Sequence, residues 1–404
     1  MIIVYISNAA SNKTLESFEK KYAKRPMRFV QQWWDYGMAS ALNRLCKDSF
    51  SAISFPPVST FPSSKCIRTN EEISADDDGL EIYIPSVWNL PVIKQRNLSR
   101  AIYRQIKKIC RSNPDQKLVI LTHCIYLQSA KPAFKLRKKY PNVSVFTIVP
   151  DLPEHATAVN FKGHAILQKL HRYYVKKTVA LSDKFDGYIC FSKPQMEHLN
   201  SERPYIVMEG YMDTSVIDAI AQAAPAPNRI VYAGGLMYRY GIRELVDGFV
   251  AAGIPSAELY IYGLGEAEEY VKGKESLGVY YGGSVSREEI IAIEKSAFLL
   301  VNPRPTVDEY SRCSFPSKLM EYMASGTPVL TSRLGCIGEE YFDKLNFVEE
   351  VTPDEISKAL KDCFTNKDEL IEKAARASQY IREYKNADHQ ASVIAEFLAS
   401  YGGK

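Results

Sequence analysis

Short apolar runs alternate with longer helical stretches along this 404-residue chain, and the alternation starts again in the second half. The apolar runs of the first half lie at 1–7, 51–57, 81–87, 117–123, 143–149 and 187–192, and those of the second half at 229–235, 258–263, 279–283, 297–303 and 328–332. Strands that alternate with helices favour parallel sheets with helices on both faces. The pattern predicts an α/β fold with two Rossmann-like domains.

The junction between the two halves is expected in the stretch 207–227, which ends in AQAAPAP. The first strand is followed by SNAASNK, so the GxGxxG fingerprint of dinucleotide-binding domains is absent there. No apolar run reaches the roughly 18 residues of a membrane span, and 1–7 lacks the basic start of a signal peptide. The eight cysteines have no CxxC spacing, which favours reduced thiols. We therefore expect a protein of the cytoplasm.

The net charge of +4 hides a strong asymmetry between the halves. Residues 1–204 hold 31 Lys and Arg against 17 Asp and Glu, a net +14, whereas residues 205–404 have a net −10. Basic side chains gather at helical spacing opposite an apolar face (Arg100, Arg104, Lys107, Lys108 and Arg111 opposite Leu98, Ile102, Ile106 and Ile109), and again at 135–139 and 169–178. They are either a solvated surface or a surface that docks on an anionic membrane.

A short helix is expected between the apolar runs 297–303 and 328–332. Ser314 is the expected N-cap, Pro316 fits the first turn, and Gly326 fits the left-handed position after the last turn. The helix should bury Phe315, Leu319, Met320 and Met323 and direct Ser317, Lys318, Glu321 and Ser325 outward.

Two charged residues of this helix suggest a nucleotide site. A helix N-terminus that follows a strand offers free N–H groups and a positive dipole, and Lys318 adds a full charge for a phosphate. Glu321, one turn further, can accept two hydrogen bonds from a ribose diol. The combination predicts a nucleoside diphosphate; the alternative is a solvated helix face.

The segment FPSKLMEYMASGTPVL, preceded by VNPRP, closely resembles the nucleotide-sugar-binding segment of family 4 glycosyltransferases. Within that family of retaining GT-B enzymes, the likeness is to the branch that builds bacterial capsule, exopolysaccharide and lipopolysaccharide sugars. The resemblance implies two Rossmann-like domains that face each other across a cleft. It implies an acceptor domain over 1–206, a nucleotide-sugar-binding domain over 207–385 and a last helix over 386–404 that crosses back to the first domain.

The same resemblance implies a hexosyl- or N-acetylhexosaminyl-transferase that uses a nucleotide-sugar donor, with a UDP-sugar favoured. The acceptor would be lipid-linked or a saccharide, and neither a cofactor nor a metal would be required. Such an enzyme would work in the cytoplasm or bound peripherally to the inner face of the plasma membrane, without nucleic acid. A nucleotide-binding pseudoenzyme and, with less support, a nucleic-acid-binding protein remain as alternatives.

The residues that match the family's donor site differ from its usual pattern. Gly235 and Tyr240 stand where relatives carry an Arg and a Lys for the diphosphate, and Cys313 stands where the wider family has a carboxylate. Arg239 is the nearest replacement cation, and Arg304 either supports the cleft or forms a structural ion pair. The donor-binding set is Gly234, Gly235, Arg239, Tyr240, Gly263, Ser314, Phe315, Pro316, Lys318, Leu319 and Glu321.

The candidate catalytic residues are Asp151, Lys318 and Glu321. Asp151 follows an apolar run near the place where relatives carry a donor-contacting His; its alternative role is that of a turn former. His123 and His155 are weaker candidates, expected to be packed or on the surface. The triplet 76–78, three aspartates before a glycine, resembles a metal-binding DxD, but we expect a solvated turn there.

Overall fold

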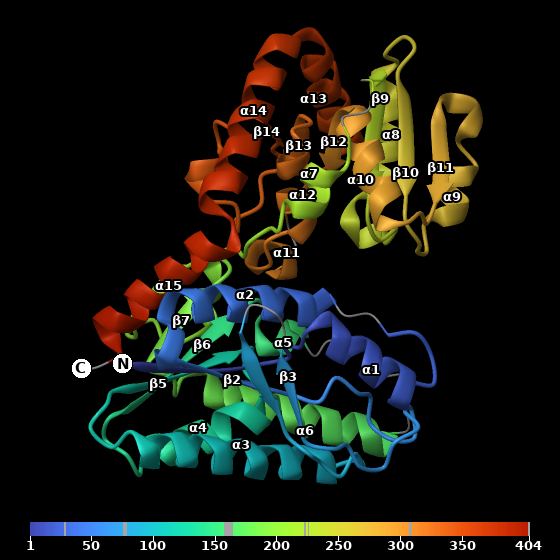
Figure 1. Ribbon diagram of the computed structural model, residues 1–404. Coiled ribbons are helices and arrows are strands. Elements are labelled where there is room, and N and C mark those ends of the chain that lie inside the picture. The colour runs from blue at the N-terminus through green and yellow to red at the C-terminus, as the bar shows by residue number, and fades with distance from the viewer. Residues whose placement is uncertain are drawn as a thin grey trace. The chain divides into compact units, whose positions relative to one another are not determined.

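The computed structural model describes residues 1–27, 30–75, 79–156, 165–221, 224, 226–306 and 309–402. The chain divides into two compact units (Figure 1). The N-terminal unit comprises Met1–Phe191, Gln195–Met208 and Ala387–Lys404, and the C-terminal unit comprises Ser192–Pro194 and Glu209–Asn386.

The described part of the N-terminal unit contains one sheet with the strand order β3-β4-β2-β1-β5-β6-β7-β8. Its strands are β1 (Ile2–Ser7), β2 (Phe50–Ser54), β3 (Glu72–Ala75), β4 (Glu81–Ile84), β5 (Leu118–His123), β6 (Val143–Val149), β7 (Gly187–Cys190) and β8 (Tyr205–Val207). All neighbours are parallel apart from β3, which runs antiparallel to β4. Since β1 lies between β2 and β5, the chain reverses direction across the sheet at β1.

Helices cover both faces of this sheet. They are α1 (Asn12–Tyr22), α2 (Val30–Cys46), α3 (Ile93–Ser112), α4 (Leu127–Arg137), α5 (Pro153–Ala156), α6 (Ala165–Ser182) and α15 (Ala387–Tyr401). Figure 1 shows α3, α4 and α6 on one face and α1 and α2 on the other. The last helix, α15, belongs to this unit: the ring of Phe397 packs edge-on against Phe146 of β6, with centroids 5.7 Å apart.

The C-terminal unit has a parallel sheet with the order β11-β10-β9-β12-β13-β14. Its strands are β9 (Ala226–Ala233), β10 (Glu258–Tyr262), β11 (Val279–Gly283), β12 (Ala297–Asn302), β13 (Val329–Ser332) and β14 (Asn346–Val348). The strands β10 and β11 lie on one side of β9, and β12, β13 and β14 lie on its other side. In open α/β sheets such a switch point is where ligands bind, at the carboxyl ends of the strands.

The C-terminal unit buries one apolar core on each face of its sheet. Its helices are α7 (Ser215–Ala219), α8 (Ile242–Ala252), α9 (Glu268–Lys272), α10 (Arg287–Ser296), α11 (Glu309–Cys313), α12 (Ser317–Ser325), α13 (Pro353–Thr365) and α14 (Lys367–Tyr384). One core includes Ile291 of α10 and Leu319 of α12. The other includes Leu245 of α8 and Leu360 of α13. Helix α12 is therefore held against the sheet by its apolar side.

The structure confirms the predicted α/β class and two parallel-sheet domains, and it corrects some details. The expected junction 207–227 contains a helix, α7, and the start of β9. On α3, Cys110 rather than Ile109 completes the buried face, because 110 continues the i, i+4 series of 98, 102 and 106. Ile109 is half-buried.

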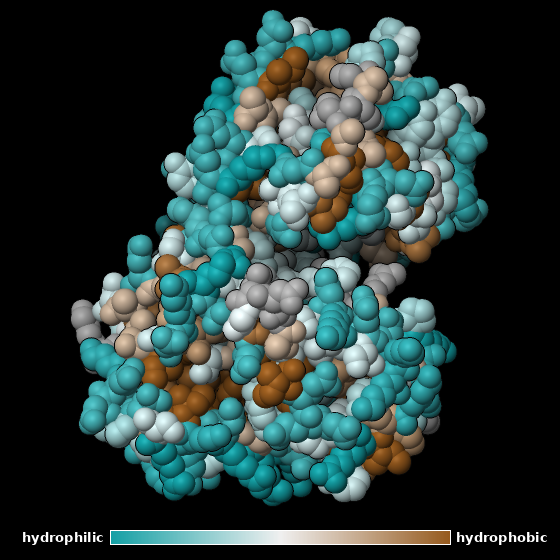
Figure 2. Space-filling view, in the orientation of Figure 1, coloured by the Kyte–Doolittle hydropathy of each residue, from teal (hydrophilic) through white to brown (hydrophobic). Residues whose placement is uncertain are grey.

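The visible surface of both units is mostly polar, with apolar side chains in scattered patches (Figure 2). Among the helices in the described ranges, none is both long enough and apolar enough to cross a membrane.

Candidate functional site

The switch point of the C-terminal sheet lies where β9 and β12 end. Tyr322 of α12 reaches the last residue of β9: its hydroxyl accepts from the Ala233 N–H at 2.8 Å and donates to the Ala233 carbonyl at 3.0 Å. Tyr322 is 1% exposed, and burial raises its pKa well above the ordinary value, so the hydroxyl keeps its proton. These two hydrogen bonds fix α12 against the end of β9.

Helix α12 begins later than the sequence predicts. Its N-cap is Pro316, not Ser314, and Ser317 is its first residue. The reason is that Ser314 closes the preceding helix α11, its N–H donating to the Tyr310 carbonyl at 2.9 Å. The other end agrees with the prediction, since Gly326 follows the last turn with a left-handed φ of 80°.

The buried side of α12 is also as predicted. Phe315, which precedes the helix, is buried, as are Leu319, Met320 and Met323. Ser325 was expected to face outward, but it is buried; its hydroxyl donates to the Tyr322 carbonyl at 2.7 Å and accepts from the Thr327 N–H at 3.2 Å. Ser325 therefore ends the helix with local hydrogen bonds.

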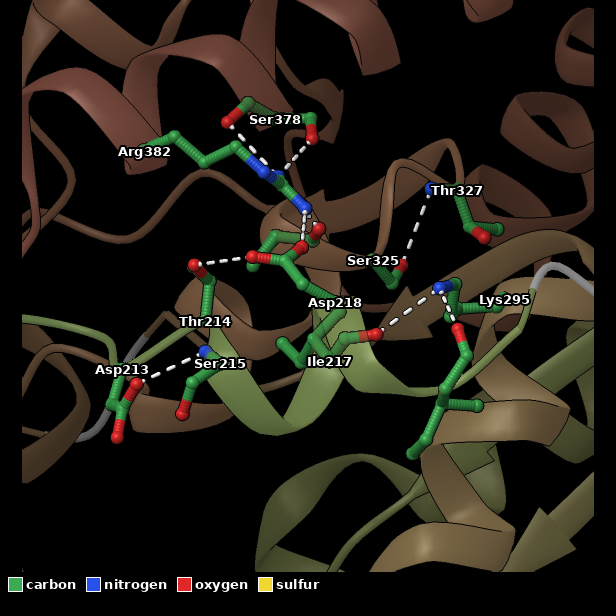
Figure 3. Close-up of polar contacts among 12 residues, drawn as sticks. Asp213, Thr214, Ser215, Ile217, Asp218, Lys295, Ser325, Thr327, Ser378 and Arg382 are labelled. Carbon is green, nitrogen blue, oxygen red and sulfur yellow. Dashed lines mark hydrogen bonds and ion pairs between the residues drawn. The ribbon is translucent and has the colours of Figure 1, made fainter.

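Figure 3 shows how the end of α12 is fixed to α7 and α14. Arg382 of α14 donates from Nη1 to the Ala324 carbonyl at 3.0 Å and from Nη2 to the Asp218 carboxylate of α7 at 2.7 Å. Asp218 also accepts from the Thr214 hydroxyl at 2.8 Å. Lys295 of α10 donates to backbone carbonyls at the end of α7, which neutralises that end of the helix. One arginine thus connects three helices.

The two charged residues predicted to bind nucleotide lie together on α12. Lys318 and Glu321 form an ion pair across one helical turn. The Lys318 side chain is 39% exposed and the Glu321 side chain 13%. Both side chains lie on the same side of the helix, so their positions allow one ligand to contact both, as the prediction requires.

A third charged residue, which the sequence reasoning missed, lies against this pair. Glu294 of α10 is 0% exposed, and its Oε1 is 3.7 Å from Lys318 Nζ. Burial and the nearby Glu321 charge raise the pKa of Glu294 to about 8, although Lys318 and Arg287 act in the opposite sense. The sequence did contain a signal: Glu294 follows Ile290 and Ile291 at helical spacing, which places it on the apolar face of α10.

In the turn after β9, the backbone of Gly234 lies close to the backbone that follows β10. Gly263, after β10, has a φ of 133°, and a Cβ there would lie 1.8 Å from the Gly234 carbonyl oxygen. A glycine is therefore required at 263. The Tyr232 hydroxyl donates to the Gly235 carbonyl at 2.8 Å, and the Tyr240 ring lies where a Gly235 Cβ would touch it at 3.3 Å. A larger residue at 235 would press on Tyr240.

Two arginines surround the ring of Tyr240. The Arg239 guanidinium lies 5.1 Å from the ring centroid and that of Arg304 lies 5.3 Å from it. Arg304 also donates from Nη1 to the Ser314 carbonyl at 3.1 Å, beside the start of α12. Positive charge is thus present beside Tyr240, next to Gly235 and the start of α12.

Asp151 of the N-terminal unit lies just past the carboxyl end of β6, half-buried. Desolvation, with the negative charges of Asp35 of α2 and of Asp151, raises the pKa of the Cys124 thiol, a residue that is half-buried. His155 falls in α5, and the triplet 76–78 lies outside the described residues.

A buried Asp–His pair lies near Asp151 and was not predicted as a pair. His123, the last residue of β5, is 3% exposed, and its Nδ1 contacts a carboxylate oxygen of Asp35. The other Asp35 oxygen accepts from the Asn8 N–H at 2.7 Å, and Trp34 stacks on the imidazole with centroids 4.7 Å apart. Of the two positions expected for His123, packed or on the surface, the structure shows the packed one.

Comparison with known proteins locates a related domain in the C-terminal unit. Residues 227–366 match the family model for glycosyl transferases group 1. This range includes the turn after β9, α10 and α12. No curated protein matches the chain.

Solved structures resemble the whole chain at low sequence identity. Sucrose-phosphate synthase from Thermosynechococcus elongatus is 13% identical, with a TM-score of 0.62 over 99% of each chain. A trehalose-6-phosphate structure from E. coli bound with UDP-2-fluoro glucose is 12% identical, with a TM-score of 0.61 over 98% of this chain and 99% of that chain. Anabaena HepE in complex with UDP is 13% identical, with a TM-score of 0.56 over 99% and 100%. The chain therefore has the GT-B fold, with a segment similar to group 1 glycosyltransferases in its C-terminal unit.

Proposed function

We propose that the protein is a retaining glycosyltransferase that moves a sugar, a hexose or an N-acetylhexosamine, from a UDP-sugar to a lipid-linked or saccharide acceptor in bacterial surface polysaccharide synthesis. The observation that carries the proposal is the Lys318–Glu321 pair on α12, whose helix is fixed to the end of β9 at the switch point of the sheet. The match of 227–366 to group 1 glycosyl transferases supports it. UDP is favoured because HepE, which has the same fold, was solved with UDP.

Lys318 would bind the diphosphate of the donor. Its ammonium group is partly exposed near the first turn of α12, where backbone N–H groups and the helix dipole also favour an anion. The diphosphate gains negative charge as the sugar leaves, so a cation at this position stabilises the transition state more than the bound donor. Arg239 and Arg304, which surround Tyr240, would add charge, and no metal ion is required.

Glu321 would hold the ribose. Its carboxylate is less exposed than Lys318, as suits a group that meets a nucleoside rather than solvent. Two hydroxyl donors of a ribose diol could replace the Lys318 ammonium as partners of this carboxylate. Donor binding would then separate the ion pair, leaving Lys318 for the diphosphate.

The N-terminal unit would supply the acceptor side. Asp151, just past the carboxyl end of β6, is the candidate catalytic residue of this unit. The resemblance to retaining enzymes implies attack by the acceptor hydroxyl on the face from which the diphosphate leaves, so we assign no side-chain nucleophile. A lipid-linked acceptor would require docking on the membrane, for which α3 offers an exposed basic face including Arg104 and Lys108.

Calorimetric titration with UDP, followed by an assay of UDP-sugar hydrolysis with and without EDTA, tests the proposal. We expect Glu321→Ala to weaken UDP binding and Glu288→Ala to leave it unchanged. We also expect hydrolysis of the UDP-sugar to continue in EDTA. Glu288 is a suitable control because it is exposed on α10. Loss of turnover in EDTA with recovery in Mn²⁺ would overturn the metal-independent mechanism, and absence of UDP binding would overturn the function.

The second candidate function is a nucleotide-binding pseudoenzyme. It is favoured by the departures from the family pattern, with Gly235 and Tyr240 in place of the usual cations and Cys313 in place of a carboxylate. UDP binding at Lys318 and Glu321 without turnover of any UDP-sugar or other nucleotide-sugar would support this candidate against the transferase.

A further inference from the structure

Glu294 is a buried carboxylate to which the proposed function gives no role. It lies on α10, 0% exposed, one residue before Lys295, which points away to the end of α7. Within the described ranges, no donor lies within full hydrogen-bond distance of either carboxylate oxygen of Glu294, and the contact with Lys318 Nζ is longer, at 3.7 Å. Burial of a carboxylate without close hydrogen-bond donors is costly unless a charge or a proton neutralises it.

The groups that face Glu294 come from two helices. On α12, Lys318 Nζ lies 3.7 Å from Glu294 Oε1. The charge of Glu321, also on α12, raises the pKa of Glu294, and the charge of Glu294 in turn raises the pKa of the buried Tyr322 hydroxyl. On α10 itself, Arg287 contributes a weaker positive charge. Lys318 is therefore one cation between two carboxylates, and it is the nearest source of neutralising charge for Glu294.

Donor binding would disturb this arrangement. If Lys318 turns toward a diphosphate, Glu294 loses its neutralising charge while it stays buried beside Glu321. The approaching diphosphate adds further negative charge on the same side. A buried carboxylate in that position is much more stable as the neutral acid.

We propose that Glu294 in its ionised form is the positioning residue for Lys318, holding the ammonium group in the free protein at alkaline pH, and that binding of a nucleoside diphosphate at that pH replaces Lys318 by a proton as the group that neutralises Glu294. A buffer acid or hydronium ion gives up the proton, whose bond to that donor breaks as the bond to a Glu294 carboxylate oxygen forms; no other bond changes. This inference rests on the proposed function, because it assumes that Lys318 binds the diphosphate.

The inference predicts a defined dependence on pH. In the free protein Glu294 has a pKa of about 8, so near pH 7 it already carries a proton and binding takes up little more. The uptake per UDP bound should rise to at most about one half of a proton at pH 8 and toward one at pH 9. Because the protonated form binds UDP better, affinity should fall above pH 8 by up to about tenfold per pH unit.

The experiment is calorimetric titration of the full-length protein with UDP at pH 7, 8 and 9, each in two buffers of different ionisation enthalpy. The difference in heat between buffers gives the number of protons taken up. UDP itself is fully ionised at pH 8 and above, because the second phosphate ionisation occurs near pH 6. The variants are Glu294→Gln, which is isosteric and cannot titrate, and the control Glu288→Gln.

The expected result is proton uptake that grows from pH 7 to pH 9 in the wild type and the control and is absent in Glu294→Gln, whose affinity should stay level above pH 8. Equal proton uptake in the wild type and Glu294→Gln would overturn the inference, as would a wild-type uptake near zero at pH 9, a measurement that needs no variant. In either case UDP still binds, so the proposed function stands. Absence of UDP binding to the wild type would instead overturn both.

Discussion

The hydroxyl of Tyr322 on α12 exchanges two hydrogen bonds with the backbone of Ala233 at the end of β9. The same helix carries Lys318 and Glu321 on its other side. The position of the charged pair relative to the strand ends therefore depends on a buried phenol, which is 89 residues from its partner in the sequence.

Replacement of this phenol by a phenyl ring is expected to weaken both folding and donor binding. In Tyr322→Phe the buried N–H and carbonyl of Ala233 each lose a partner, which should cost about 1–3 kcal/mol of unfolding free energy. Urea denaturation measures the loss, and a UDP titration measures the effect on the site. The exposed Tyr173→Phe serves as control, and equal stability of Tyr322→Phe and wild type would contradict the structural role of the pair.

The order of most strands could be predicted from the sequence because each shows its own hydrophobic period and its own boundaries. The strands β3, β8 and β14 were not predicted, because three or four residues carry too little of such a period. The buried face of α12 was predictable for the same reason as the longer strands: Leu319, Met320 and Met323 follow a helical repeat that ends at Gly326. The error at Ser314 arose from α11, a five-residue helix without a clear hydrophobic repeat, which takes up the Ser314 N–H.

The partners of the charged pair could not be predicted, since they come from other elements. Glu294 is 24 residues before Lys318, and its burial beside that lysine arises only when α10 and α12 pack on the same face of the sheet. The Asp35–His123 pair likewise joins α2 to β5. Spacing along a chain shows which residues share a helix face, but not which two helices become neighbours.

Glu321→Ala is expected to weaken UDP binding by about 1.5–3 kcal/mol, the usual contribution of hydrogen bonds to a charged group, which is roughly 10- to 150-fold in Kd. A ribose role predicts in addition that 2′-deoxy-UDP binds the wild type more weakly than UDP does, whereas Glu321→Ala no longer distinguishes the two. Calorimetry with both nucleotides on both proteins gives the four dissociation constants that this comparison requires. A variant that still prefers UDP over the deoxy analogue would show that another group contacts the diol.

Lys318→Ala is expected to reduce kcat more than it raises the donor KM. The physical reason is that the diphosphate carries more charge in the transition state than in the bound donor. Steady-state kinetics of UDP-sugar turnover separates the two effects, with the exposed helix lysine in Lys358→Ala as control. A loss confined to KM would mean that Lys318 binds the donor equally in both states.

Glu294→Gln is expected to stabilise the protein at alkaline pH. The folded-state pKa of about 8 lies above the ordinary glutamate value, so the wild type binds a proton on folding and loses stability as the pH rises toward 8, by up to about 1.4 kcal/mol per pH unit. The variant lacks this loss. Its melting temperature relative to wild type should therefore be higher at pH 8.5 than at pH 5, with Glu288→Gln unchanged at both; the opposite trend would mean that an ionised Glu294 stabilises the fold through Lys318.

The basic face of the N-terminal unit leads to the last prediction, which concerns the membrane. Arg104 and Lys108 are exposed on α3, and Lys107 beside them is half-buried. Lys135 of α4 extends over the ring of Tyr103 on α3, so the charges of the two helices adjoin. Each Lys or Arg near an anionic surface contributes up to about 1 kcal/mol to binding, and salt screens that contribution.

At low salt the protein should sediment with vesicles that contain anionic lipid, and at high salt it should dissociate from them. It should not bind neutral vesicles. Reversal of Arg104, Lys107 and Lys108 to Glu should weaken this binding and the turnover of a lipid-linked acceptor. Donor hydrolysis in solution should be spared, because the proposed donor site lies in the C-terminal unit. A matched reversal of Lys358, Lys361 and Lys367, which are exposed in the C-terminal unit, controls for the change of net charge. If both triple variants bind anionic vesicles equally, the basic face serves only to keep the N-terminal unit hydrated, because a docking surface must lose more from its own charges than from distant ones.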